Sequence, residues 1–396
     1  MKSLLRNHFL AIVIGLVLSW IILIFFFRSS ESFQIAPLPK DKVISASRTL
    51  IDTNISNLLA SENLEVELAA NLQDHHTITL MGSSEMTNLP YSSYRLLPDT
   101  MGVSVFGFGH QHHQSFAIYC ELLALKEYIK DSKICIILSP GWFESSGTNI
   151  EAFLEFVRPN FLKRIALDTS VSLASKLVIG RYINQNYELI DDPNIGLDYF
   201  NNLYVFQHIP KFNDFFETNT NSIQKVSYIY ENKVEHKIKK TSLIQKYAWN
   251  SQLSTLQTDF KNKIKSNKRF INDSYFKTYI EQVGGTAKKG NFDVLDISKN
   301  QEYLDFKCLL KLLKKENCQA SFIMQGLNPL HYQNLSHFDP MLEQIKSDLK
   351  ACEFPLHNQF TSKPNHYEPG TLTDIMHLGN YGWLKINRFL INTYEK

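Results

Sequence analysis

A serine, a histidine and an aspartate stand where nucleophilic catalysis would need them. Ser84 comes directly after the apolar run 77–81, in the sequence Gly-Ser-Ser-Glu. A serine hydroxyl is a poor nucleophile until a base takes its proton, and imidazole often serves as that base. His377 follows Asp374 by three residues, so one loop can carry both the base and the carboxylate that orients it. We therefore predict that Ser84, His377 and Asp374 form a triad for acyl transfer through a serine ester.

The segments around Ser84 predict the sheet that positions it. Apolar and β-branched residues at 77–81, 103–109 and 133–139 are typical of buried strands, and residues 114–129 have the apolar spacing of a helix. A strand, a helix and a strand in this order form a parallel sheet that is covered on both faces. Such sheets gather their reactive residues at the carboxyl ends of the strands. We therefore expect an α/β fold with Ser84 at a strand end.

The same alternation returns near the end of the chain. Residues 301–315 and 341–352 predict helices, and residues 320–324 predict a strand between them. Apolar residues at helical spacing in 379–394 predict a last helix directly after His377. This helix would hold the catalytic loop from its C-terminal side.

The stretch from about residue 149 to residue 290 is rich in Asn, Lys and aromatic residues and carries no recognisable motif. We interpret it as a helical insertion over the active edge of the sheet. Its lysine-rich runs, at 225–246 and 261–269 with Lys288 and Lys289, are interpreted as solvated faces. The alternative is a surface that attracts a polyanion or anionic lipid headgroups.

Three neighbouring histidines, His110, His112 and His113, are the other candidates for chemistry. Adjacent histidines in one short loop seldom converge on one metal ion, and no set of Asp, Glu or Cys partners is evident. We predict no metal and no cofactor, and interpret the cluster as opening the helix or lining the mouth of the site. His331 is an alternative base, but it lacks an acid placed as Asp374 is.

Composition sets the broad class of the chain. At 396 residues, 44% of them hydrophobic, the chain can bury a large core in one or two domains. Its 41 basic and 39 acidic side chains leave a net charge of +2, so nothing global demands a nucleic-acid partner. An odd number of cysteines, five, without a Cys-x-x-Cys pair argues against a zinc site and a full disulfide framework.

The N-terminal region predicts a membrane anchor. Residues 9–27 have Ser19 as their only clearly polar member, and at helical rise they are long enough to cross a bilayer core of about 30 Å. Lys2, Arg6 and the amino terminus precede this run and Arg28 follows it, which favours a cytosolic N-terminus. A secretory signal peptide is the alternative, but no small-x-small cleavage site follows. We predict an uncleaved, single-pass anchor in the cell membrane.

This anchor divides the chain into parts. Residues 1–8 are predicted to be cytosolic, and 28–75 to form a tether and a helical stalk. Residues 76–396 are predicted to form the extracytoplasmic catalytic domain, which includes the helical insertion.

Several short motifs resemble those of a known family. They are 81–85, 114–115, 139–143 and 374–379, followed by Gly382 and Trp383. Their order and spacing resemble the SGNH (GDSL-like) hydrolases and, among them, the DltD family of D-alanyl-lipoteichoic acid biosynthesis proteins. The resemblance implies a flavodoxin-like, three-layer SGNH-hydrolase-type fold.

The resemblance also implies an oxyanion hole. Its donors would be the backbone N–H of Ser84 and that of Gly107 or Gly109, although these glycines have the alternative role of simply ending a strand. The third motif departs from the pattern, since SGNH hydrolases have an asparagine there and proteins like DltD often a glutamine. Gly141 stands at that place, so the hole is formed differently or lacks one donor.

The implied function is the transfer of D-alanine to hydroxyls of lipoteichoic acid or a related envelope glycopolymer. The implied partners are a membrane-bound O-acyltransferase, a D-alanyl carrier protein reached directly or indirectly, the anionic glycopolymer and the membrane. Two alternatives remain: a membrane-tethered esterase or thioesterase of the SGNH type, and a non-catalytic scaffold for an acyl carrier or O-acyltransferase.

Overall fold

The computed structural model describes most of the chain from Leu64 onward. The described residues are 64–86, 89–109, 111–144, 147–191, 194–206, 244, 247–264, 267–282, 292 and 296–395. The cytosolic segment predicted at 1–8, the anchor predicted at 9–27 and most of the predicted tether and stalk lie outside them. Within the described ranges, no helix combines the length and the apolar character that spanning a bilayer requires.

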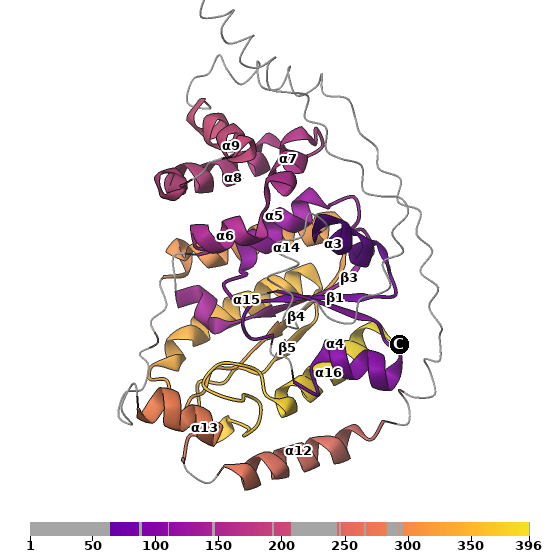
Figure 1. Cartoon of the computed structure of the whole chain (residues 1–396), viewed down its shortest axis with the longest axis vertical. Coiled ribbons are helices and arrows are strands. Elements are labelled where there is room, and N and C mark those ends of the chain that lie inside the picture. The colour runs from indigo at the N-terminus through magenta and orange to yellow at the C-terminus, as the bar shows by residue number, and fades with distance from the viewer. Residues whose placement is uncertain are drawn as a thin grey trace, which may run out of the picture. The chain divides into compact units, whose positions relative to one another are not determined.

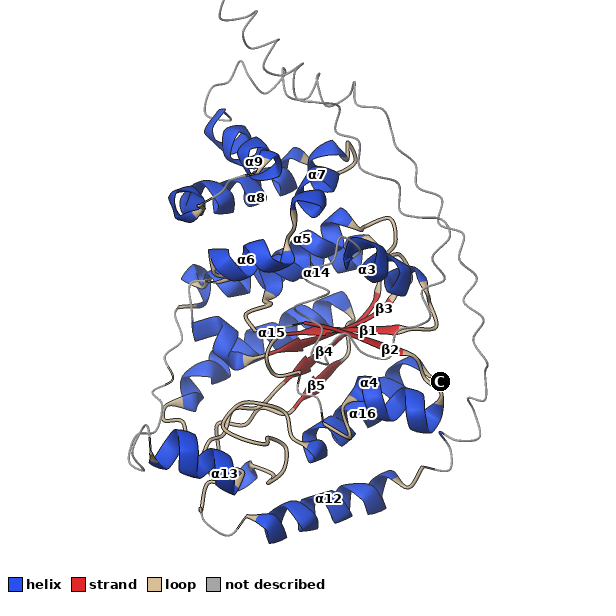
Figure 2. Ribbon diagram, in the orientation of Figure 1, coloured by secondary structure: helices blue, strands red, loops and turns tan. Residues whose placement is uncertain are grey.

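A parallel five-stranded sheet forms the centre of the described structure (Figure 2). Its strands are β1 (Ile78–Gly82), β2 (Val105–Gly109), β3 (Lys133–Leu138), β4 (Gln319–Met324) and β5 (Leu356–Asn358). They lie in the order β2-β1-β3-β4-β5, and every neighbouring pair is parallel. This is the doubly wound, flavodoxin-like order, in which the winding direction changes between β1 and β3. The predicted α/β class with a parallel sheet is confirmed.

The strands bury side chains on both faces of the sheet, because successive residues of a strand point to opposite sides. Met81 and Ile136 belong to the apolar core on one face, whereas Leu80 and Ile137 belong to the core on the other. Helices lie on both faces of the sheet (Figure 1), and their side chains complete each core. The first core includes residues of α3 (Leu64–Gln73), α5 (Ser115–Ala124), α14 (Gln301–Lys315) and α15 (Asp339–Cys352), and the second includes residues of α4 (Ser93–Leu96) and α16 (Asn380–Tyr394).

Helix α14 illustrates how the sequence sets a boundary. The side chain of Asn300 accepts a hydrogen bond from the N–H of Tyr303 at 3.0 Å, which satisfies a backbone donor that the first turn leaves free. The same side chain donates to the carbonyl of Phe143 at 2.6 Å. Helix α14 therefore begins where predicted, and its start is fastened to the loop that follows β3.

The described parts of the region from about residue 149 to residue 290 are helical. These helices pack in separate places and do not form one layer. Helices α6 and α7 contact α5, α8 packs on α9, and α12 packs on α16. The segment of α13 and η4 lies against the loop that carries His377, since Ile375 packs on the cluster of Ile271, Phe276 and Ile280. Of these elements, α13 and η4 therefore lie beside the loop of the candidate base. The bounds are α6 (Ile150–Phe156), α7 (Pro159–Leu167), α8 (Leu173–Asn186), α9 (Ile195–Phe206), α12 (Trp249–Lys263), α13 (Asp273–Tyr275) and η4 (Phe276–Glu281).

Short 3-10 and π turns complete the described elements. They are η1 (Leu97–Met101), η2 (Pro140–Glu144), η3 (Tyr187–Leu189), η5 (Ile297–Lys299), η6 (Leu335–Phe338) and η7 (Pro364–His366). Of these, η2 directly follows β3, so it lies at the edge of the sheet where β1 ends.

Candidate active site

The candidate nucleophile lies on a tight turn at the carboxyl end of β1. The strand ends at Gly82, and the N–H of Met86 donates to the carbonyl of Ser83 at 3.1 Å, which closes the turn. The N–H of Ser83 donates to Oε1 of Glu85 at 2.6 Å. Glu85 is 2% exposed, whereas Ser84 between them is exposed. The turn therefore buries the side chain of Glu85 and exposes Ser84 to solvent. It lies beside the point between β1 and β3 where the winding direction of the sheet changes.

The candidate base and its carboxylate come from one loop before α16. Nδ1 of His377 lies 2.7 Å from Oδ2 of Asp374, while Oδ1 of Asp374 accepts from the N–H groups of Met376 and His377 at 2.9 and 2.8 Å. These hydrogen bonds fix the carboxylate in place, so that it orients the ring. Because Nδ1 faces Asp374, Nε2 is left to exchange protons with a substrate or a serine.

The loop of His377 is fixed by a hydrogen bond within the loop and by hydrogen bonds from the residue that follows β4. The N–H of Thr373 donates to the carbonyl of His377 at 2.9 Å. Nε2 of Gln325, directly after β4, donates to the carbonyl of Met376 at 2.9 Å and to Oγ of Ser139 at 3.1 Å. Gln325 thus joins the base loop to the end of β3, so the carboxyl ends of two strands fix the base.

The charges of the base and of one residue of the nucleophile turn act on each other. The hydrogen bond with Asp374 raises the pKa of His377 above its ordinary value against the effect of burial, and the charges of Asp374 and Glu85 act in the same direction. Burial raises the pKa of Glu85 to about 7, although its backbone hydrogen bonds and the charge of His377 favour ionisation. His377 and Glu85 are therefore close enough for each charge to shift the pKa of the other.

Ser84 and His377 do not share a hydrogen bond in the described part of the chain. Catalytic hydrogen bonds are often long in a protein without substrate and shorten in the complex. The side chain of His377 is 29% exposed. Both groups are thus reachable from solvent, while their supports are buried.

The two glycines expected at the oxyanion hole lie at different depths in β2. Gly109 is the last residue of β2 and pairs with Gly82, whereas Gly107 pairs with Leu80 inside the sheet. A Cβ added to Gly109 would lie 1.9 Å from the carbonyl oxygen of Gly82, so a side chain does not fit there. Of the two, Gly109 lies nearer to the turn that carries Ser84.

A comparison with protein-family models assigns the chain that carries this geometry to a family. The model described as DltD protein matches residues 63–395, which include Ser84, Asp374, His377 and all the described residues. The chain belongs to the DltD family. A comparison with curated proteins gave no match. Membership in the DltD family supports involvement in the D-alanylation of teichoic acid.

The third motif differs from the pattern expected of DltD-like proteins at Gly141. This glycine lies in η2, and a Cβ added there would meet only Oγ of Ser139, at 3.6 Å. Space for a side chain therefore exists at this position. The hydroxyl of Ser139 lies beside this position and accepts a hydrogen bond from Gln325.

The histidine cluster separates into residues with different surroundings. His110 lies outside the described residues, His112 is exposed, and His113 is buried with Nδ1 3.1 Å from the carbonyl oxygen of Gly82. His331 lies 3.0 Å from Nη1 of Arg269 through its Nδ1. A search of the described residues found no group of three or more His, Cys, Asp or Glu side chains that could hold a metal ion.

Sequence reasoning missed the buried ionisable residues around the turn. Glu85 was quoted only as part of a motif, and His113 was grouped with its exposed neighbour His112. The sequence carries one signal of these buried groups: Glu121 is the only charged residue of the apolar helix α5. A charge inside an apolar helix needs a buried partner, and Nε2 of His113 provides it at 2.9 Å from Oε2 of Glu121.

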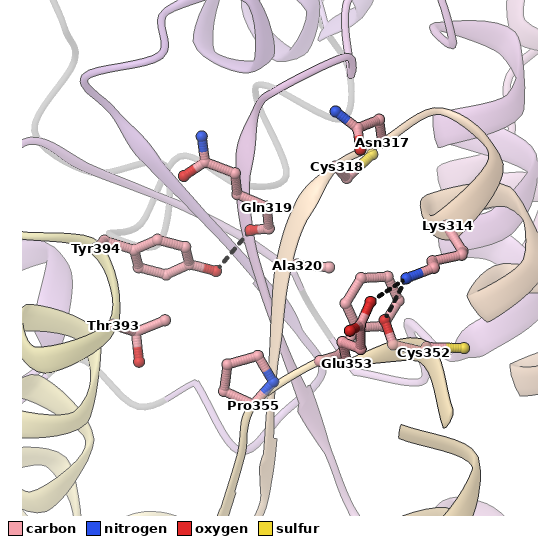
Figure 3. Close-up of a pocket in the computed structure, with 11 residues that line it drawn as sticks. Lys314, Asn317, Cys318, Gln319, Ala320, Cys352, Glu353, Pro355, Thr393 and Tyr394 are labelled. Carbon is pink, nitrogen blue, oxygen red and sulfur yellow. Dashed lines mark hydrogen bonds and ion pairs between the residues drawn. The ribbon is translucent and has the colours of Figure 1, made fainter. Parts of the chain in front are cut away.

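A separate cavity lies at the opposite edge of the sheet. It has a volume of about 260 Å³ and is lined by residues at the amino ends of β4 and β5, with Tyr394 of α16 (Figure 3). The hydroxyl of Tyr394 donates to the carbonyl of Gln319 at 3.0 Å, and Nζ of Lys314 lies 2.8 Å from Oε2 of Glu353. Parallel strands place this cavity away from Ser84 and His377, so it is not part of the candidate active site.

Proposed function

We propose that this chain is a membrane-anchored serine acyl-transfer enzyme of the SGNH type, which places D-alanine on hydroxyls of lipoteichoic acid or a related envelope glycopolymer. Residues 9–27 would anchor it, with the catalytic domain outside the cytoplasm. The observation that carries the proposal is the pairing of His377 with Asp374 beside the turn of Ser84, at the switch point of the sheet. Family membership supplies the acyl group and the class of acceptor.

In the first half-reaction, the Ser84 hydroxyl attacks the carbonyl carbon of an activated D-alanyl group while Nε2 of His377 takes its proton. Asp374 stabilises the resulting imidazolium and fixes the tautomer. The oxyanion accepts hydrogen bonds from the backbone N–H of Ser84 and, in this proposal, that of Gly109 rather than Gly107. When the bond to the leaving group breaks, His377 returns the proton to that group and leaves a D-alanyl ester on Ser84.

In the second half-reaction, a polymer hydroxyl attacks the ester carbonyl and His377 accepts its proton. The tetrahedral intermediate then releases Ser84, which regains the proton from the imidazolium. The acceptor decides the outcome, because water in place of the polymer hydroxyl gives hydrolysis. The exposure of Ser84 and His377 is compatible with a large polymer, whose hydroxyls reach a catalytic group more easily on an open surface.

The proposed partners follow from this chemistry. A membrane-bound O-acyltransferase would present the D-alanyl group, which reaches it after activation on a D-alanyl carrier protein in the cytosol. The acceptor polymer is anionic, and ester-linked D-alanine adds ammonium groups that lower its net negative charge.

The test is ester-linked D-alanine on the cell envelope, released by mild alkali. A strain that lacks this protein is complemented with wild type, Ser84→Ala or Ser298→Ala, the last as an exposed serine elsewhere on the chain. We expect wild type and Ser298→Ala to restore D-alanine and Ser84→Ala to fail, with equal protein in the membrane. Restoration by Ser84→Ala would favour the scaffold, and a rise of D-alanine in the deletion strain would favour the esterase.

A further inference from the structure

The peptide group between Gly82 and Ser83 is held at both ends by buried ionisable side chains. Its carbonyl oxygen lies 3.1 Å from Nδ1 of His113, and its N–H donates to Oε1 of Glu85 at 2.6 Å. Because a carbonyl only accepts, Nδ1 of His113 must carry a proton. His113 is 0% and Glu85 is 2% exposed. We call this arrangement of His113, Glu85 and the Gly82–Ser83 peptide the peptide clamp.

The imidazole of the clamp is itself fixed from three sides. Its Nε2 lies 2.9 Å from Oε2 of Glu121, and both side chains are fully buried. The ring stacks on Phe156 with centroids 4.1 Å apart and meets the edge of Phe108 at 5.2 Å. His113 therefore has one available position, and the Gly82 carbonyl is held by a rigid donor.

The clamp acts on the peptide group that leads directly into the turn of Ser84. We propose that His113 and Glu85 are positioning residues that orient this peptide and so set where the Ser84 hydroxyl and N–H lie relative to His377. This inference rests on the proposed function and deepens it. A change in the tilt of this peptide displaces the nucleophile, and a misplacement of about 1 Å can reduce a rate by about 100-fold.

A purely structural role does not explain the choice of residues. Apolar side chains of similar volume would often stabilise a buried site as well as or better than an ion pair. Here two carboxyl groups and an imidazole are buried instead, and Oε1 of Glu121 has no hydrogen-bond partner among the described residues. Groups that form directional hydrogen bonds are needed where a peptide group must keep one orientation, which is the condition at this turn.

Matched variants separate positioning from stability. His113→Ala and Glu85→Ala remove each half of the clamp, whereas His113→Asn keeps a donor near the position of Nδ1 and Glu85→Gln keeps an acceptor for the Ser83 N–H. Asp305→Asn is the control, because Asp305 is a buried carboxyl on α14 that accepts from Gln301 at 2.7 Å. All are made in the full chain, purified in detergent.

Three quantities are measured for each variant. They are the maximal rate and the binding constant of Ser84 labelling by a fluorophosphonate probe, the hydrogen exchange of the peptide spanning residues 80–86, and the thermal midpoint. We expect the alanine variants to lower the maximal labelling rate about 100-fold with little change in probe binding, and to speed exchange at the Ser83 amide. The Asn and Gln variants should recover most of the rate, and Asp305→Asn should change the thermal midpoint alone.

Several results would overturn the inference. One is faster exchange in the alanine variants with wild-type labelling, and another is unchanged exchange. A third is a labelling rate that follows the thermal midpoint in every variant, Asp305→Asn included. A wild-type chain that the probe does not label contradicts the proposed function and the positioning role with it, whereas a slowly exchanging Ser83 amide would still establish the clamp.

Discussion

The two edges of the central sheet differ in where their charged groups lie. At the carboxyl edge, Glu85, His113 and Asp374 are all at most 6% exposed. At the amino edge, the ion pair beside the cavity of Figure 3 joins Lys314 and Glu353, whose side chains are 49% and 83% exposed. Buried charges are unfavourable unless they are well paired, whereas exposed pairs contribute little. The groups beside the candidate site therefore carry a cost of burial that the exposed pair beside the cavity does not.

This difference agrees with the proposed chemistry at the carboxyl edge. Charges act strongly on one another where water is excluded, and prearranged dipoles there need no reorganisation during a reaction. Shifts of pKa cluster at functional sites for this reason. Five substitutions each alter a charged or ionisable side chain at one edge or the other. The size of their effects should depend on the edge.

The largest effect is expected from His377→Ala at the carboxyl edge. Without the imidazole, nothing takes the proton from Ser84, and by analogy with other serine enzymes the rate should fall on the order of 10⁶-fold. The measurement is the rate of fluorophosphonate labelling, with the exposed His112→Ala as control. Labelling near the wild-type rate in His377→Ala would remove it from the proposed triad.

A smaller loss is expected from Asp374→Asn. The amide cannot stabilise the imidazolium, and it favours the wrong tautomer of His377, so the rate should fall about 10⁴-fold. Labelling kinetics check this, with the thermal midpoint measured in parallel because Asp374 also accepts from two backbone N–H groups. Wild-type kinetics in a folded Asp374→Asn protein contradict the orienting role.

The pH dependence should change in Glu85→Gln. His377 acts as a base only when neutral, so activity is lost as pH falls through its raised pKa. Because the charge of Glu85 is one cause that raises this pKa, its removal should move the acid limb of the rate profile to lower pH. The limb is measured by labelling between pH 5 and pH 9, and an unmoved or upward-shifted limb argues against the coupling.

Stability should respond to the buried carboxyl of Glu302 on α14. Burial raises its pKa to about 8 from the ordinary value of 4.5. The folded state therefore holds a proton that the unfolded state releases, so this contribution is fully present below about pH 4.5 and is lost as pH rises through 8. Glu302→Gln should lessen this loss by about 4 kcal/mol, as read from urea unfolding at pH 5 and pH 8.5. An equal pH dependence in the variant and wild type would contradict the shift.

The smallest effect is expected from Lys314→Ala at the amino edge. The exposed pair with Glu353 is screened by water, so its loss should leave the thermal midpoint almost unchanged. Labelling of Ser84 should equal that of wild type. A loss of labelling comparable with that of Asp374→Asn would end the contrast between the two edges.

The sequence predicts the parts of this fold whose signal is local. Strands β1 to β4 and helix α14 appear as apolar runs or helical spacing, and the family resemblance is confirmed by the DltD model. Strand β5 is not predictable in this way, since it is three residues long and contains His357 and Asn358. It becomes a strand through its pairing with β4, a tertiary contact that no local pattern records.

For the candidate site, too, the sequence predicts some residues and not others. Ser84, Asp374 and His377 were proposed from spacing and resemblance, and the structure brings the base loop to the nucleophile turn. The clamp was not predicted, because one half is a contact across the fold, between Gly82 of β1 and His113 before α5, and the other depends on Glu85 turning back to the N–H of Ser83. The division of the helical region also escaped prediction, since its polar and aromatic composition does not say whether a helix packs on α5 or on α16.

The base loop lies just before the last helix, whereas the nucleophile turn follows the first strand. A chain made from its amino terminus therefore exposes Ser84 long before His377 exists. A nascent or shortened chain that ends before residue 374 would have a serine without a base, and so would be chemically inert. In the proposed mechanism, activity is thus confined to chains that extend past His377, because of the order of these two segments.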